Sequence, residues 1–159
     1  MKKVALICCL AFLISCKSGK TSSSVATEEN KPESKKLNLS EVSSIKKRRA
    51  YELGKRVLMT CNTSSFKPFT AEEATEEVLK KINKEKISMI CQNILRVFGQ
   101  FNDMQLVEAL RFDENQITLF RYKCDYEKKY KTKELQVTIN DENKITAITT
   151  KDWKDAYHP

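Results

Sequence analysis

The spacing of apolar residues changes at Gly99, and this change divides the folded part of the chain into two halves. Before Gly99, apolar residues recur every three or four positions, which is the period of one face of an α-helix. After it they alternate with polar or smaller residues, which is the period of a β-strand. Helices followed by strands predict an α+β domain.

Three helices are predicted before this change. Ser40 is suited to cap the first, which runs to about Met59. Residues 70–73, Thr-Ala-Glu-Glu, have the pattern of a capping box and predict a second, shorter helix. The third runs from about Lys84 to Phe98, and Gly99 is placed to end it.

Four strand segments are predicted after it, joined by short connections that imply antiparallel pairing. They cover residues 104–110, 117–126, 135–139 and 145–150, with a hairpin turn at 140–144. In the third segment Leu135, Val137 and Ile139 are predicted to face the helices, and Gln136 and Thr138 to face outward. The expected architecture is cone-like: three N-terminal helices on one face of a curved antiparallel sheet of about four strands.

The N-terminus has the pattern of an export signal. Two lysines precede an uncharged run from Val4 to Ile14, which is shorter than the roughly 20 apolar residues that span a bilayer. Residues 13–16, Leu-Ile-Ser-Cys, resemble the lipobox of bacterial lipoproteins. The resemblance implies that residues 1–15 are removed and that Cys16 carries lipid, which holds the protein on a membrane.

This pattern predicts four regions and a location. Residues 1–15 are a lipoprotein signal peptide, 16–36 a disordered tether rich in Ser, Lys and Glu, 37–153 a single domain, and 154–159 a C-terminal tail. The expected location is the cell envelope, on the periplasmic face of the outer membrane.

Positive charge is the other feature of the composition that bears on partners. Without Lys2 and Lys3 the chain keeps 27 basic against 21 acidic residues. An exported protein meets anionic lipid or acidic envelope polymers rather than nucleic acid, so no nucleic-acid partner is predicted. The basic clusters at residues 46–49 and 128–133 are also consistent with solvated surfaces.

Three cysteines remain beyond the lipobox, enough for one disulfide in an oxidising compartment. Cys91 shares the apolar stripe of the third predicted helix, so it is expected to be buried and reduced. If a disulfide forms, it is then predicted to join Cys61 to Cys124. Their spacing matches no zinc signature.

The order of elements is similar to the nuclear transport factor two-like superfamily, which includes ketosteroid isomerase-like proteins. The residues that carry the resemblance are 50–69, which look like that family's first helix and aromatic turn, and the strands from Phe101 to Thr150. The resemblance implies a pocket between the concave face of the sheet and the helices. Such a pocket holds a ligand, supports catalysis, or is filled by side chains, and the fold alone does not choose among these.

Aromatic residues on one face of the second strand are the candidates for that pocket. Phe120, Tyr122 and Tyr126 share this face, and the third helix is expected to cover it. Packing is the simpler explanation for them, because a tyrosine usually buries its ring and finds a partner for its hydroxyl. Trp153 is expected to pack the end of the last strand against a helix.

Catalytic patterns are sparse. The only histidine, His158, lies next to the C-terminal proline, and the three glycines form no phosphate-binding loop. Asp103 and Asp125 could serve as a base only if they were desolvated in the pocket. We therefore predict no catalytic residue, no cofactor and no metal site.

Three functions are compatible with these sequence patterns. The first is a non-catalytic envelope module that binds a small apolar ligand or an envelope protein. The second is an accessory lipoprotein whose pocket is filled, and the third an isomerase or dehydratase. An open apolar cavity would favour the first, a filled interior the second, and a buried carboxylate in a cavity the third.

Overall fold

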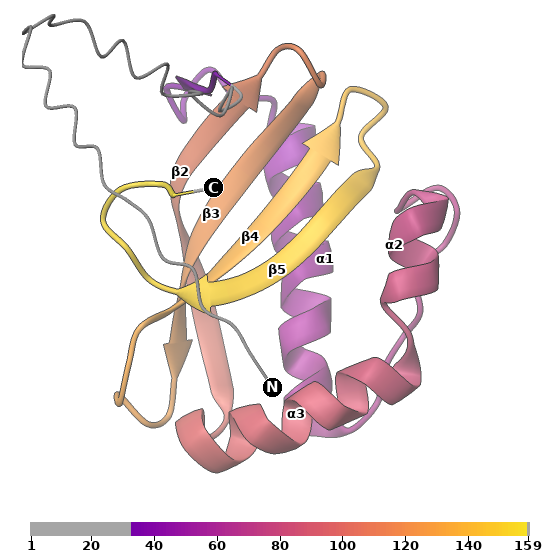
Figure 1. The fold of residues 1–159 in the computed structure, drawn as a ribbon, viewed down its shortest axis with the longest axis vertical. Helices are drawn as coiled ribbons and strands as arrows, with labels where there is room; N and C mark the ends of the chain where they lie inside the picture. The colour runs from indigo at the N-terminus through magenta and orange to yellow at the C-terminus, as the bar shows by residue number, and fades with distance from the viewer. Residues whose placement is uncertain (1–32, 159) are drawn as a thin grey trace, which may run out of the picture. The chain divides into compact units, whose positions relative to one another are not determined.

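A long helix crosses the face of a five-stranded antiparallel sheet in the computed structural model, which describes residues 33–158 (Figure 1). The strands lie side by side in chain order: β1 (Lys35–Lys36), β2 (Phe101–Phe112), β3 (Ile117–Tyr126), β4 (Lys133–Asn140) and β5 (Ile145–Asp152). The helices are α1 (Ser44–Thr63), α2 (Glu76–Lys81) and α3 (Lys84–Phe98). The predicted α+β class and antiparallel sheet are confirmed.

The bounds of the helices and strands differ from the sequence prediction mainly near the start of the described residues. The predicted tether was extended to residue 36, but Lys35 and Lys36 pair with Arg111 and Leu110 as strand β1. This pairing adds a strand to the four that were predicted. Helix α1 begins at Ser44 instead of near Ser40, because residues 39–42 form turns. Cys16 and the predicted signal peptide lie outside the described residues.

The second helix also begins later than its capping pattern indicated. The Thr70 N–H donates to Oε2 of Glu73 at 3.0 Å, as in a capping box. These hydrogen bonds stabilise a turn at residues 70–73 instead of starting a helix. Residues 73–75 then run beside the start of β5, where Ile145 exchanges backbone hydrogen bonds with Glu73 and Thr75. Helix α2 starts only at Glu76.

The core lies between α1 and the sheet. Leu135, Val137 and Ile139 have no exposed surface and face the helices, as their alternation predicted. The helix approaches closely at Gly54, where an added Cβ would lie 2.7 Å from Cδ2 of Leu135. A larger residue at this position would force the side chain of Leu135 and its neighbours to shift.

The opposite face of the sheet is covered as well, and this was not predicted. Gln136 points to that face as expected, but it is only 7% exposed. Residues 153–158 turn back over it, although the chain from residue 154 onward was predicted to be a tail. The Lys154 carbonyl accepts from Nη2 of Arg121 at 2.7 Å, and the Tyr157 ring packs on Phe112. Trp153 stacks on Arg121 here instead of packing against a helix.

None of the helices within residues 33–158 is both long enough and apolar enough to cross a membrane.

Candidate ligand-binding groove

The aromatic residues predicted to line a pocket lie in the filled core. Phe120, Tyr122 and Tyr126 share one face of β3, as predicted, and are 0%, 1% and 4% exposed. The Tyr122 ring lies 6.3 Å from that of Tyr51, and the Tyr126 ring lies 5.6 Å from that of Phe98. Burial raises the pKa of both β3 tyrosines well above the usual range. The interior is therefore closed around Phe120 and Tyr122, whereas Tyr126 also borders an open hollow of about 320 Å³ at the β3–β4 connection.

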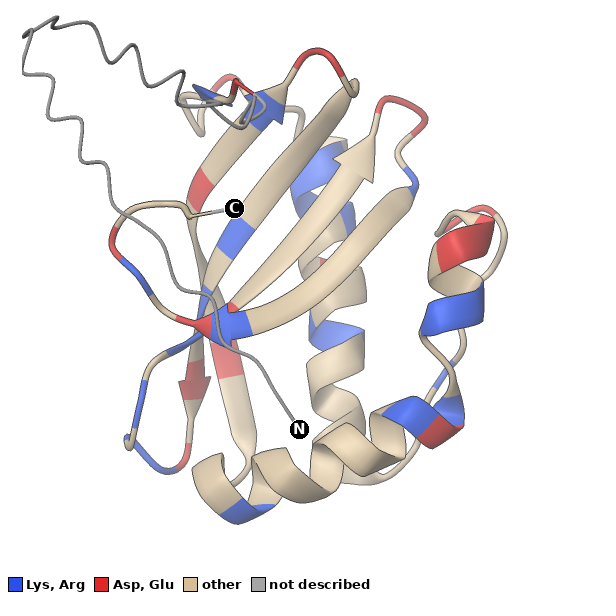
Figure 2. Cartoon of the chain, viewed as in Figure 1, with Lys and Arg blue, Asp and Glu red and all other residues tan. Residues whose placement is uncertain are grey.

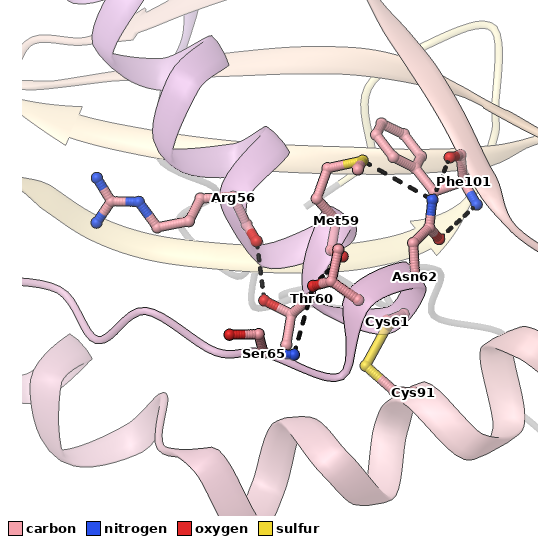
Figure 3. The surroundings of a disulfide bond; sticks show 9 residues. Arg56, Met59, Thr60, Cys61, Asn62, Ser65, Cys91 and Phe101 are labelled. Carbon is pink, nitrogen blue, oxygen red and sulfur yellow. Dashed lines mark hydrogen bonds between the residues drawn. A yellow bond between two sulfur atoms is a disulfide. The ribbon is translucent and has the colours of Figure 1, made fainter.

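The predicted disulfide is wrong, because Cys61 bonds to Cys91 and not to Cys124 (Figure 3). The apolar stripe of α3, which contains Cys91, lies against the end of α1 that carries Cys61, and the two Cα atoms are 4.8 Å apart. Cys124 is the free, buried thiol on β3, and burial raises its pKa to about 12. Cys91 is buried among apolar residues, as predicted, but it is not reduced. Apolar neighbours alone do not distinguish a buried thiol from a buried disulfide.

The disulfide helps to shape an open groove at the β5 side of the sheet. It fastens α3 to α1, while the strand-like pairing at Ile145 fastens the segment before α2 to β5. Helices α2 and α3 consequently stand beyond the edge of the sheet (Figure 1). A hollow of about 250 Å³ lies between α3 and strands β4 and β5. Its wall is mainly aliphatic, with side chains that include Val57, Ile87, Ile90, Ile94, Leu135 and Ile148.

Ile90 shows that this wall is incompletely covered. It lines the groove together with Ile87 and Ile94 of the same helix, but it is 53% exposed, and its neighbour Met89 is 64% exposed. Lys81 and Lys86 stand at the rim, together with Thr149 and Thr150 of β5. The described residues that line the groove include no carboxylate. Such a site can hold an apolar chain and pair with a negative charge at its mouth, but it offers no general base.

The aspartates that were considered as bases do not line the groove, and both are exposed. Asp103 is exposed and accepts from the Tyr51 hydroxyl at 2.7 Å and from Lys55 Nζ at 3.0 Å. These hydrogen bonds lower the pKa of Asp103 to about 2. Asp125 is exposed and pairs with Lys129. Both carboxylates border an open hollow of about 320 Å³ beside the connection between β3 and β4. Neither is desolvated there, which is what a base of the isomerase kind requires.

A buried charged cluster on the opposite face of the sheet was missed by the sequence analysis. Arg121, 1% exposed, donates to Glu134 at 2.6 and 3.1 Å and to Glu108 at 2.5 Å, and Gln136 also donates to Glu134. The cluster satisfies its own charges beneath Trp153 and Tyr157. An arginine between Phe120 and Tyr122 in β3 was the signal that could have revealed it, because such a residue is rarely buried without a partner. No group of three or more His, Cys, Asp or Glu within residues 33–158 is arranged to hold a metal ion.

The two basic clusters have different environments. In the first, Lys46 pairs with Asp141 at 2.7 Å, and Lys47 and Arg49 donate to backbone carbonyls of neighbouring loops. These side chains hold α1 against its surroundings. In the second cluster the lysines of the connection between β3 and β4 are exposed, whereas Lys133, the first residue of β4, is half-buried and pairs with Asp152 at 2.8 Å.

Comparison with known proteins yielded no match to a protein family, a characterised protein or a solved structure. The similarity to the nuclear transport factor two-like superfamily therefore stays a prediction.

Proposed function

We propose that this protein is a lipid-anchored envelope lipoprotein whose domain is a non-catalytic binding module for a single-chain anionic amphiphile such as a fatty acid. The apolar chain lies in the groove between α3 and strands β4 and β5, and the charged head pairs with the lysines at its mouth. The anchor follows from the lipobox at Cys16.

The observation that carries the binding proposal is the composition of the groove. Its wall is aliphatic, and its two charged rim residues are both lysines, Lys81 and Lys86. A hollow of about 250 Å³ lies just below the range of roughly 300–1,000 Å³ that drug-sized ligands occupy, so it suits one slender chain. Each buried methylene contributes about 0.8 kcal/mol, which makes affinity increase with chain length.

A pair of tryptophan substitutions in β5 tests the site. Ile148 faces the groove, because it pairs with Val137 on the core side of the sheet, whereas neighbouring Ala147 pairs with Thr138 on the other side. Ile148→Trp should fill the groove and abolish binding of laurate measured by calorimetry. Ala147→Trp adds the same ring to the same strand on the opposite side and should leave binding unchanged.

Two further comparisons check the chemistry of the site. Lys81→Gln with Lys86→Gln should weaken laurate binding several-fold, and octanoate should bind more weakly than laurate by more than tenfold. Laurate should also raise the melting temperature of the wild type, because a ligand that binds only the folded state stabilises it. Equal laurate binding by the Ile148→Trp and Ala147→Trp proteins would refute the site. No binding by the wild type would favour the accessory lipoprotein with a filled pocket.

A further inference from the structure

The connection between β3 and β4, residues 127–132, presents an aromatic ring among lysines. Tyr130 is 73% exposed and is flanked by Lys128, Lys129 and Lys131. This connection lies against the last turn of α3: the Lys128 N–H donates to the Phe98 carbonyl at 2.9 Å, and Lys128 Nζ donates to the Arg96 carbonyl at 3.1 Å (Figure 2). We call residues 127–132 the basic loop.

The charge around the basic loop is positive. Six cations lie on the loop and next to it, Arg96, Lys123, Lys128, Lys129, Lys131 and Lys133, against four carboxylates, Asp103, Asp125, Glu127 and Asp152. Lys129 pairs with Asp125, and Lys131 pairs with Asp152 at 3.3 Å. The side chains of both lysines remain more than half exposed, and exposed pairs of this kind exchange readily for a stronger anionic partner.

We infer that the basic loop docks on the surface of an anionic lipid bilayer. A tyrosine has an apolar ring and a polar hydroxyl, so it is suited to the level of the lipid headgroups, where the flanking lysines meet phosphates. The contact is independent of the groove and does not rest on its proposed ligand.

The predicted anchor is compatible with this contact. The described chain begins beside β1, which pairs near Arg111, at the opposite end of β2 from the basic loop. The 12 residues of β2 span about 40 Å. Residues 17–34 reach up to about 60 Å when extended. A domain tethered through Cys16 can therefore place its basic loop on the membrane that holds its lipid.

Vesicle flotation tests the inference. The protein from residue 16 onward, carrying Cys16→Ala so that no acyl chain contributes, is mixed with phosphatidylcholine vesicles containing about one-third phosphatidylglycerol. We expect it to float with these vesicles at low salt, to be released as salt rises, and not to float with pure phosphatidylcholine. One lysine near an anionic surface contributes roughly fivefold in partitioning. Exchanging Lys128, Lys129 and Lys131 together for Gln should therefore reduce binding more than tenfold.

Two variants distinguish docking of the basic loop from attraction that depends only on the net charge of the protein. Exchanging Lys67, Lys80 and Lys84 for Gln removes the same charge from exposed positions between α1 and the start of α3, outside the groove, and it should keep most of the binding. Tyr130→Ala should weaken binding several-fold with an unchanged melting temperature, because its ring is largely exposed. The inference fails if both triple variants lose binding equally, or if the wild type does not float. It also fails if the protein with an unaltered loop binds soluble dextran sulfate through the loop lysines but does not bind vesicles, because the loop would then recognise a polyanion and not a lipid surface.

Discussion

Adjacent residues of β4 experience different environments, although both are buried. Val137 faces α1 in the apolar core, and Gln136 lies beside Glu134 in the charged cluster. Alternation along the strand predicted the side each residue faces, but the burial of Gln136 depends on residues 153–158, which are not its neighbours in sequence. A free tail was the expectation for residues 154–159. The aromatic residues Trp153 and Tyr157 are what make the covering segment pack.

Aspartate substitutions at these two positions should both be destabilising. Val137→Asp places an unpaired charge in the core and should cost several kcal/mol, enough to unfold the domain. Gln136→Asp removes a donor to Glu134 and adds a like charge beside it, and should cost about 1–3 kcal/mol. Urea denaturation measures both, with Ala147→Asp as an exposed control expected within about 0.5 kcal/mol of wild type. A Gln136→Asp protein as stable as this control would show that the cluster is not closed in solution.

Glu73 gives stability a defined dependence on pH. Hydrogen bonds from Arg56, at 2.7 and 2.8 Å, lower the pKa of Glu73 below its usual value. The contribution of ionised Glu73 to the free energy of unfolding is therefore complete above about pH 4.3, the pKa of glutamate in the unfolded chain. It is lost as the pH falls through the lower pKa of Glu73 in the folded protein. Glu73→Gln should cost about 1–2 kcal/mol at pH 7 and less below about pH 4. Urea denaturation at both pH values measures this cost. The control is Glu76→Gln, which breaks an exposed pair with Lys80 and should cost under about 0.5 kcal/mol at pH 7.

Helix α3 depends on its covalent link to α1 more than the other elements do. Much of its apolar stripe borders the groove and is not packed against the sheet, and Ile90 stays exposed. The disulfide closes a loop between cysteines 30 residues apart, for which chain entropy predicts about 3–4 kcal/mol of stabilisation. Cys61→Ala with Cys91→Ala should lower stability by about that amount. It should also increase hydrogen exchange across residues 84–98 more than across β2 to β4.

Peptide mapping after alkylation without reductant checks the pairing directly. The expected result is a peptide linked through Cys61 and Cys91, with Cys124 alkylated only after unfolding because it is buried. A peptide that contains Cys124 in a disulfide would contradict the structure.

The elements themselves were largely predictable from local patterns. Helix α3 has the predicted bounds, because Asn83 caps it and Gly99, with φ of 73°, ends it, and β3 also has the predicted bounds. Strand β1 was missed because two lysines carry no apolar period and pair only because β2 offers an edge. The groove could not be located from the sequence, since it depends on how far the disulfide and the Ile145 pairing hold α3 from β5.

The whole molecule is expected to remain on a membrane through one residue. Cys16→Ala in the full chain should give an unprocessed, unlipidated precursor, because no other cysteine follows a lipobox. Metabolic labelling with a palmitate analogue measures this, and label on the Cys16→Ala protein would exclude the lipobox assignment. A Cys124→Ala protein, which loses a thiol beyond the lipobox, should label as the wild type does.

The strand order of the sheet also determines how quickly the domain can form. Strands β2 to β5 pair with their neighbours in the chain, so each hairpin closes a short loop and the sheet can assemble by successive local steps. Three contacts must wait for distant segments: α1 on the sheet, β1 with β2 across some 75 residues, and residues 73–75 with Ile145 across some 70 residues. Stopped-flow refolding of the disulfide-intact protein should therefore show fast formation of the sheet. Deleting residues 33–36 should speed unfolding and leave the folding rate almost unchanged.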